Sequence, residues 1–421
     1  MRTRTLPLLV AILMVSSLAS QSIEVTRSAY LKHKPERNSE YFRKMEPGDV
    51  LTLLKTEKEN GYYFAQYRNF KGYVYKSFVK ATDEQGPSPT VVDGALEIYI
   101  LDTGAGLCSV ARTPNDKYIV YDAGHWTPKG FSYQKISSII KEGSDIELMV
   151  LSHTDGDHIS AAAEVIRNYN VKKLLDTGFE RSHVGENQRA GYRNVLNAVR
   201  DNPRTKHINL HERDSIITPG NSLTIDGVKA TFLCGFGEPL REWIPSFEMN
   251  NSPDWRIKSL KINGVSIVMK LSFSGVNILF CGDAVGRRIG GSSDQLIGTE
   301  KWLMDNARQY LKSDIIVAPH HGADNGSSTA FIGAVGPETV IFSAGSEHDH
   351  PTKGAAKRYL KAVDINNIYR TDRGDNEGGF EWENNSSGCE DPKGDDDILV
   401  KIESGTYSVS YMNPNASCPD E

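Results

Sequence analysis

The sequence predicts an α+β protein with an αββα four-layer sandwich, preceded by a small all-β barrel. From residue 95 onward, β-hairpins alternate with strand–helix units in two similar halves, which fits two inner sheets covered by helices. Residues 23–81 contain short strand-like runs separated by turn signals, the pattern of a small barrel. Between these regions, Gly86, Pro87 and Pro89 stand among polar residues, which is typical of a linker.

The first twenty residues have the features of a signal peptide. Arg2 and Arg4 precede an apolar run at residues 6–18, and small residues follow at 17–19. We therefore expect residues 1–20 to be removed and the mature chain to be secreted or periplasmic, with a retained membrane anchor as the alternative. No later segment approaches the ~18 apolar residues that a membrane helix needs, so we expect no transmembrane segment in the mature chain.

Composition limits the range of functions. The chain has 421 residues and a formal net charge of −6 at pH 7. This charge argues against a globally basic nucleic-acid coat protein, but it is compatible with a local basic groove.

The five cysteines leave at least one thiol unpaired in a monomer, because their number is odd. Cys108 and Cys281 lie in apolar strand-like segments and are expected to be buried small hydrophobic residues. Cys389 and Cys418 flank a terminal hairpin. Whether they form a disulfide in an oxidising compartment is left open.

Residues 21–82 form the predicted barrel, with a hairpin turn expected at Asn60-Gly61. The segment resembles a bacterial Src-homology-3-like domain in residues 31–35, 45–50, 61–63 and 71–74. The resemblance implies a peptide or cell-wall ligand, although Tyr62 stands where that family often has Trp. A spacer or packing role is the alternative.

After the linker at residues 83–94, residues 95–421 form the larger predicted domain. Strands are expected at 96–101, 107–111, 118–121, 148–151, 171–175, 222–234 (a hairpin), 266–273, 276–281, 315–318, 340–343, 398–402 and 407–411. Helices are expected at 136–141, 159–169, 188–200, 300–312 and 353–363.

The most informative stretch is residues 150–158. An apolar strand ends at Ser152, and four side chains able to bind a metal follow within six residues: His153, Asp155, Asp157 and His158. Imidazole nitrogens combined with carboxylate oxygens suit ions such as zinc or manganese. A loop of solvated charges is the alternative, but a burial-seeking strand running straight into four clustered ligands argues against it.

This stretch resembles the His-x-His-x-Asp-His signature of the metallo-β-lactamase superfamily. Asp155 replaces the second histidine, and the resulting His-x-Asp-x-Asp-His pattern is similar to that of the ComEC-like (competence protein) branch. Five further stretches resemble that branch in the same order: residues 102–109 with 121–124, 280–283, 318–322, 342–345 with 350–351, and 369–372.

The resemblance implies a centre with two divalent ions, zinc or manganese. Counting ligands places His153 and Asp155 on the first ion, Asp157 and His158 on the second, Asp283 between the two, and His320 on the second. His321 is expected to contact a ligand or the substrate, although the order of His320 and His321 can be reversed. Asp122 is expected to orient a ligand through hydrogen bonds.

The third ligand of the first ion is not determined. The superfamily usually supplies a histidine from a loop after the signature, and the candidates are His183, His207 and His211. His183 is favoured because it follows a strand by several residues, whereas His207 and His211 are expected on the surface of a strand. Alternatively, Asp155, water and Asp283 complete this site.

The expected chemistry is hydrolysis of a phosphoester by water that two ions activate. Asp157 would steer the proton of the attacking water, and His350 would donate a hydrogen bond or proton to a phosphoryl oxygen or the leaving group. A histidine in a turn before Pro351 is the alternative for His350. Asp155 in place of histidine makes the first site harder, which favours manganese.

The resemblance implies an exported phosphodiesterase or nuclease acting on DNA. Four basic residues after residue 283 can contact phosphates or form a solvated helix face: Arg287, Arg288, Lys301 and Arg308. The alternatives are a cell-wall phosphoester esterase of the phosphorylcholine type, which the small barrel favours, a β-lactam hydrolase, and a non-catalytic wall-binding protein.

Overall fold

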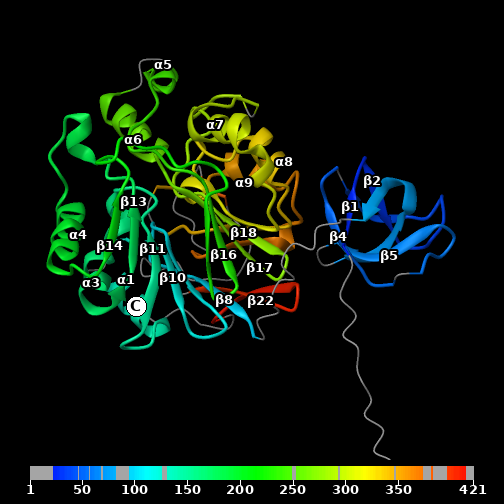
Figure 1. The fold of residues 1–421 in the computed structure, drawn as a ribbon. Coiled ribbons are helices and arrows are strands. Elements are labelled where there is room, and N and C mark those ends of the chain that lie inside the picture. Colours follow the sequence, from blue (N-terminus) through cyan, green and yellow to red (C-terminus); the bar gives the residue numbers. More distant parts are fainter. Residues whose placement is uncertain are drawn as a thin grey trace, which may run out of the picture. The chain divides into compact units, whose positions relative to one another are not determined.

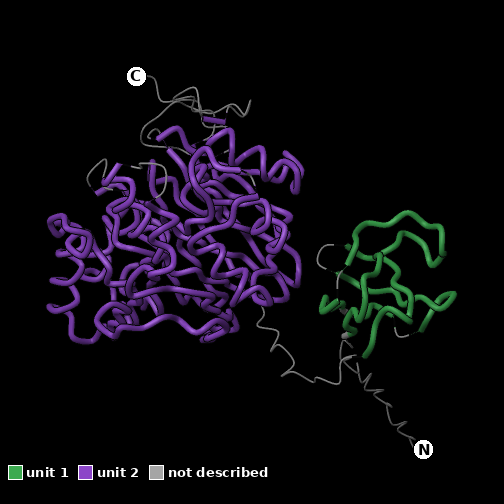
Figure 2. The backbone as a smooth tube through the Cα atoms, turned by 90° about the horizontal axis from the view of Figure 1, so that it is seen from above, with its two compact units in different colours: residues 1–87 green, residues 88–421 purple. Residues whose placement is uncertain are grey.

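The computed structural model describes residues 22–45, 47–55, 57–67, 70–81, 94–125, 130–248, 253–292, 294–345, 348–372, 381–382 and 396–413. The chain divides into two compact units, residues 1–87 and 88–421 (Figure 2). The predicted signal peptide, nearly all of the predicted linker, Cys389 and Cys418 lie outside the described residues. Among the described residues, we find no helix with the length and apolar character needed to cross a membrane.

The first unit is a small all-β region. Its strands are β1 (Ser22–Val25), β2 (Ala29–Lys32), β3 (Tyr41–Met45), β4 (Val50–Leu53), β5 (Tyr62–Tyr67), β6 (Phe70–Tyr75) and β7 (Val79–Ala81), in the order β3-β2-β6-β5-β4-β1-β7. Buried Val25, Leu31 and Val74 contribute to its core. Asn60 and Gly61 have φ angles of 50° and 82°, which confirms the predicted hairpin turn. The likeness to Src-homology-3 domains stays a prediction.

The second unit contains two large sheets. The first sheet consists of β8 (Leu96–Ile100), β9 (Cys108–Arg112), β10 (Tyr118–Ala123), β11 (Asp145–Val150), β12 (Asn170–Val171), β13 (Lys173–Asp176), β14 (Lys206–Asn209), β22 (Ile398–Glu403) and β23 (Thr406–Tyr411). The second consists of β15 (Ser222–Ile225), β16 (Val228–Cys234), β17 (Val268–Phe273), β18 (Val276–Phe280), β19 (Ile315–Val317), β20 (Thr339–Phe342) and β21 (Ile368–Arg370).

Nine α-helices of the described residues accompany these sheets (Figure 1). They are α1 (Phe131–Ile139), α2 (Gly156–Ile159), α3 (Ala162–Asn168), α4 (Ala190–Asp201), α5 (Ile244–Glu248), α6 (Asp254–Gly264), α7 (Gly298–Asn306), α8 (Thr329–Val335) and α9 (Lys353–Tyr359). The sequence did not predict α5, α6 and α8.

The layers follow from which faces of the strands are apolar. Alternate residues of β11 point to opposite faces, and both faces are buried: Val150 packs between the sheets and Met149 packs under helices. The central core lies between the two sheets, where the Tyr121 and Phe280 rings are 5.0 Å apart. A second core joins α1, α3 and α4 to the first sheet, and a third joins α5 to α9 to the second. This order agrees with the predicted sandwich.

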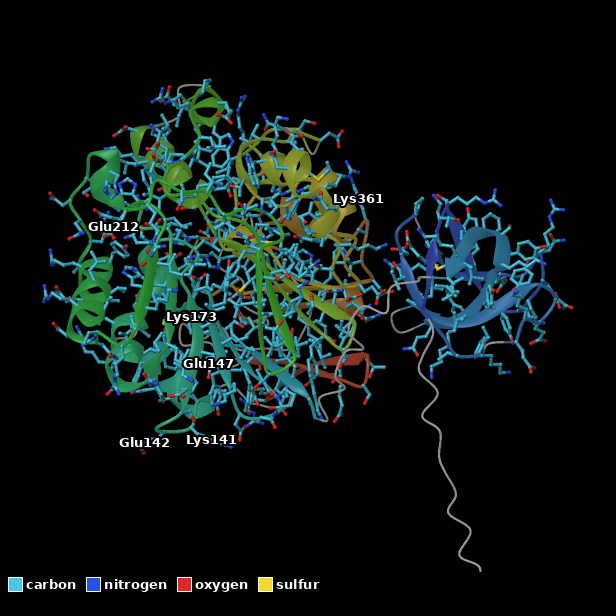
Figure 3. The ribbon with its side chains drawn as sticks, in the orientation of Figure 1. Lys141, Glu142, Glu147, Lys173, Glu212 and Lys361 are labelled. Carbon is cyan, nitrogen blue, oxygen red and sulfur yellow. The ribbon has the colours of Figure 1, made fainter. Side chains whose placement is uncertain are left out.

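The exterior of this unit is polar, in contrast to its interior. Charged side chains such as Lys141, Glu142 and Lys361 are exposed on its surface (Figure 3). The most unusual buried polar groups gather at one edge of the two sheets. Here parallel strands β10, β11 and β13 of the first sheet and β18 to β21 of the second have their carboxyl ends. Loops at such ends commonly carry binding sites.

Candidate metal centre

The strand-to-helix junction after β11 forms as the sequence predicted. β11 ends at Val150, and α2 begins at Gly156, so residues 153–158 turn sharply at the sheet edge. His153 and His158 are fully buried there, although histidine is seldom buried completely. Their burial indicates a site rather than a loop of solvated charges.

Four donor atoms, from Asp157, His158, Asp283 and His321, lie within 4.8 Å of one another. His158 Nε2 is 3.2 Å from His321 Nε2, 3.1 Å from Asp283 Oδ1 and 3.7 Å from Asp157 Oδ2. His321 Nε2 is 3.5 Å from Asp283 Oδ1 and 3.6 Å from Asp157 Oδ2. A tetrahedral ion at about 2.1 Å from each donor would separate the donors by roughly 3.4 Å. The four side chains therefore fit one divalent ion, and we call them the tetrahedral group.

Two buried donor atoms support this fit. Among the described residues, His153 Nε2 and Asp283 Oδ1 have no hydrogen-bond partner. His153 Nε2 lies 3.8 Å from Asp283 Oδ2, beside the tetrahedral group. Buried polar atoms without partners destabilise a fold, and a bound cation would satisfy both atoms.

The outer nitrogens of the three histidines fix the direction of the inner ones. His158 Nδ1 is 2.8 Å from Asp122 Oδ2, as the sequence predicted for Asp122. His321 Nδ1 is 2.7 Å from the Ser343 carbonyl oxygen, and His153 Nδ1 is 3.0 Å from Ser152 Oγ. Each Nε2 is therefore left to face the centre, the usual arrangement of histidines that bind metals.

The buried carboxylates and histidines at the centre shift one another's pKa values. Burial raises the pKa of Asp283, but the surrounding histidines outweigh it and hold that pKa well below its ordinary value. Burial and the charge of His158 lower the pKa of His153 to about 3, so His153 is neutral near pH 7. Burial lowers the pKa of His158, but Asp283, Asp157 and Asp122 outweigh it and raise that pKa well above its ordinary value. The last shift shows an excess of negative charge that a bound cation would offset.

Asp155, predicted as a ligand of the first ion, lies outside the tetrahedral group. Its two carboxylate oxygens accept hydrogen bonds from Arg181, with Nε to Oδ1 at 2.8 Å and Nη2 to Oδ2 at 2.5 Å. Arg181 begins the 3₁₀ helix η2 (Arg181–Val184). Sequence analysis missed Arg181.

The histidines proposed as the third ligand of the first ion lie elsewhere. His183 Nδ1 accepts a hydrogen bond from the Glu180 backbone at 3.0 Å, and its ring is 4.1 Å from that of His211. His207 Nε2 is 2.9 Å from Asp176 Oδ2 on the neighbouring strand. The structure therefore brings none of these histidines into the tetrahedral group.

His321, rather than His320, belongs to the tetrahedral group, so the order of the pair is the reverse of the favoured one. Both lie in the 3₁₀ helix η6 (Pro319–Gly322). His320 Nε2 is 3.4 Å from Asp283 Oδ2, and His320 Nδ1 is 2.7 Å from Asn325 Oδ1. The ring of His350 lies 5.5 Å from that of His320.

Asn263, at the end of α6, is a further residue that sequence analysis missed. It is buried, and its Nδ2 lies 3.2 Å from Asp283 Oδ2 and 3.3 Å from His320 Nε2. Pro253 followed by Asp254 in the first turn is a signal that could have predicted α6. No pattern in the sequence singles out Asn263 itself.

A pocket of about 1420 Å³ gives access to the group. Asp157, Asp283 and His321 line it, together with His350. Several cations also line it: Arg181, Arg189, Arg256, Arg287, Arg288 and Lys353. The arrangement combines a buried cation site with an opening lined by both cationic and carboxylate side chains.

Residues 101–230 match the model of the metallo-beta-lactamase superfamily. The chain contains a metallo-β-lactamase domain. Domains of this superfamily are generally hydrolases, and the fold implies binding of divalent metal, in agreement with the His/Asp group.

The metallo-β-lactamase domain also has relatives among competence proteins. The chain is 28% identical over 251 residues to Recombination protein 2 of Haemophilus influenzae, covering 59% of this chain and 24% of that protein. It is 30% identical over 117 residues to Competence protein ComA of Neisseria gonorrhoeae, covering 27% and 15%. The chain thus spans less than a quarter of the length of either relative. The homology is weak but agrees with the ComEC-like resemblance.

Among solved structures, the metallo-β-lactamase fold protein YhfI from Bacillus subtilis matches with a TM-score of 0.36 and 10% sequence identity. The match covers 65% of this chain and 95% of YhfI.

Proposed function

We propose that the protein is an exported, metal-dependent phosphodiesterase that cleaves DNA. The observation that carries this proposal is the tetrahedral group, three of whose members, Asp157, Asp283 and His321, line a pocket that also carries arginines. A centre that activates water, beside fixed positive charge, suits attack on a phosphodiester, whose oxygens gain charge in the transition state.

Asp157, His158, Asp283 and His321 would hold the ion, which when bound lowers the pKa of water and stabilises charge on phosphoryl oxygens. Zinc and manganese both suit these nitrogen and oxygen donors. Asp122 keeps the Nε2 of His158 aimed inward. Hydrolysis adds one water across the P–O bond: the hydroxyl goes to phosphorus, and the remaining proton goes to the leaving alkoxide. Asp157 would accept the proton first.

His350 is the candidate for contact with the substrate. It lines the pocket, and burial, together with the charges of His320 and His321, holds its pKa well below its ordinary value. A neutral imidazole can donate one hydrogen bond to a phosphoryl oxygen or to the leaving group.

An exposed aromatic residue supports a nucleic-acid substrate. Trp255, on the first turn of α6, is 61% exposed and lines the same pocket. The guanidinium of Arg256 lies 5.2 Å from the centre of its ring. An aromatic ring beside cations is how proteins hold single strands, since the ring stacks on a base and the cations bind phosphates.

Of the four cations expected to contact phosphate, only two line the pocket. Arg288 and Arg287 do so, but Arg287 is buried and paired with Asp324 at 2.6 Å. Lys301 instead pairs with Asp305 on the exposed side of α7, at 2.7 Å. Phosphate contacts are therefore assigned to Arg288 together with the missed residue Arg256.

We further propose that residues 1–20 direct export and that the first unit binds a peptide or cell-wall ligand. Both proposals rest on the sequence features described above. A unit that binds the cell wall would also suit a wall phosphoester esterase, and the substrate assay must distinguish the two functions.

The test is hydrolysis by the full chain of four substrates, with added manganese or with added zinc. They are single-stranded DNA, bis-p-nitrophenyl phosphate, a phosphorylcholine ester and a chromogenic cephalosporin. We expect cleavage of the first two and weaker binding of DNA as salt increases. Cleavage of the phosphorylcholine ester or the cephalosporin alone would overturn the proposal.

A further inference from the structure

The structure and the sequence pattern differ in the number of ions they support. The pattern implies two ions, with Asp155 on the first. We propose instead that the centre holds one resident ion, and that Arg181, anchored by Asp155, supplies the positive charge expected from the second. The role of Arg181 toward substrate rests on the proposed function, whereas the ion count does not.

The ligands for one ion are already assembled. Asp157, His158, Asp283 and His321 have the spacing of one tetrahedral ion. In the part of the chain that the structure describes, no other set of three or more His, Cys, Asp or Glu side chains converges in this way. His153 is the one predicted first-ion ligand outside the group that faces it, with Nε2 3.8 Å from Asp283 Oδ2. It can complete the coordination of the one ion.

Asp155 is already paired with Arg181. Both of its oxygens face the Arg181 guanidinium in a two-point, charge-assisted arrangement. The side chains of this pair are only 14% and 16% exposed, so the pairing is largely protected from solvent. A second divalent ion bound at Asp155 would have to share the carboxylate with a fixed positive charge, which opposes its binding.

Local packing explains why Arg181, and not His183, reaches Asp155. The segment after β13 does approach the signature loop, as the superfamily pattern predicts. Within it, however, His183 accepts the backbone N–H of Glu180 and closes the first turn of η2. Its ring packs on Phe179, with ring centres 5.4 Å apart. Arg181, two residues earlier, extends to Asp155 instead.

Once anchored by Asp155, Arg181 still has N–H groups that can contact a substrate. A guanidinium has five N–H groups in a fixed plane, and Asp155 takes two of them. Arg181 lines the same pocket as Asp157 and His321. Its Nη1 lies 3.4 Å from Ser259 Oγ and 3.8 Å from Glu186 Oε2. A phosphoryl oxygen next to the tetrahedral group would replace these longer contacts, where a second cation would otherwise stand.

The ion count is tested by elemental analysis of the purified full chain after saturation with manganese or zinc and removal of free metal. We expect about one ion per chain in the wild type and in Asp155→Asn, because Asp155 is not a ligand. The electron paramagnetic resonance spectrum of bound manganese should be that of an isolated ion. Two ions per chain, a spin-coupled manganese pair, or loss of an ion in Asp155→Asn would overturn the inference.

The role of Arg181 is tested separately, by kinetics on bis-p-nitrophenyl phosphate. Losing a charge-assisted contact should raise KM or lower kcat by on the order of tenfold in Arg181→Gln, with partial recovery in Arg181→Lys. Arg200→Gln, at an exposed arginine of α4 that pairs with its neighbour Asp201, is the matched control. Circular dichroism checks folding. If Arg181→Gln behaves like this control, Arg181 has no such role.

The ion-count test can fail independently of the proposed function, whereas the Arg181 test requires phosphodiester cleavage. One ion per chain with no phosphodiester cleavage would leave the ion count standing and remove the proposed function. Phosphodiester cleavage with two ions per chain would remove the one-ion inference and leave the proposed function standing.

Discussion

Three loops supply the metal donors, and the two that carry histidines present them differently. The loop after β11 carries His153 and His158, and the loop after β19 carries His320 and His321. The first loop passes directly into α2, and none of its residues has a positive φ angle. In the second, His320 and His321 have φ angles of 50° and 55°, in the left-handed region that non-glycine residues seldom adopt.

This difference determines how far spacing in the sequence can be trusted. In an ordinary strand or helix, the direction of a side chain follows from its position. This relation does not hold for two consecutive residues in the left-handed conformation, so the spacing of His320 and His321 does not indicate which one faces the centre. Such conformations cost on the order of 1–3 kcal/mol each and persist only where the surroundings hold them. Here the Ser343 carbonyl holds His321, and Asn325 holds His320.

The largest effect should come from the first loop. We expect Asp157→Ala to abolish phosphodiester cleavage, with a loss well beyond the 10–100-fold that removal of an outer partner of a ligand typically costs. Far-ultraviolet circular dichroism should match the wild type, because Asp157 is in the first turn of α2 and packs no core. Asp201→Ala, a matched exposed carboxylate, should keep full activity. Full activity in Asp157→Ala would exclude the mechanism.

The second prediction distinguishes the two histidines of the late loop. His321→Ala should weaken manganese or zinc binding, measured by isothermal titration calorimetry, by more than about 100-fold, because it removes one of four ligands. His320→Ala should weaken binding by only about tenfold, because His320 lies beside the tetrahedral group. The reverse order of effects would show that the late loop presents His320 to the ion.

The third prediction concerns support for the first loop. Asp122 accepts hydrogen bonds from Ser152 N at 2.6 Å and Ser152 Oγ at 2.7 Å, besides its contact with His158. Asp122→Asn keeps the shape but removes the charge that orients His158. We expect metal affinity to fall about 10–100-fold. An unchanged affinity, measured in the same titration, would mean that the turn into α2 alone orients His158.

The sequence predicted the parts of the site that follow local rules. The strand ending at Val150 and the cluster at 153–158 depend on spacing within one strand–loop–helix unit. The four-layer order followed from alternation of strands and helices and from the continuous apolar run of β11. These features depend on neighbours in the chain.

The parts that could not be predicted depend on contacts between distant segments. Arg181 pairs with Asp155 across 26 residues, and Asn263 meets Asp283 across 20 residues. Neither residue type is unusual in its own segment, so no local pattern marks them. His183 has the expected spacing, but its imidazole Nδ1 accepts a hydrogen bond from the Glu180 backbone N–H within the turn.

The last and smallest prediction uses a histidine–carboxylate pair that lies outside both loops. His207 on β14 contacts Asp176 on β13, with Nε2 2.9 Å from Oδ2. Burial lowers the pKa of His207, but the hydrogen bond and charge of Asp176 outweigh it and raise the pKa above its ordinary value. The paired, charged histidine therefore stabilises the fold fully below the unfolded pKa of about 6.5, and this contribution is lost as pH rises through the higher folded-state pKa.

We expect His207→Gln to lower the free energy of unfolding by about 1 kcal/mol at low pH and by much less at high pH. Urea denaturation of the wild type and the variant, on either side of the folded-state pKa, measures this difference. Metal affinity should not change, since His207 is not part of the tetrahedral group. A loss of stability that is the same at both pH values would mean that His207 contributes packing rather than charge. A loss of metal affinity would mean that β14, as well as the three loops, supports the centre.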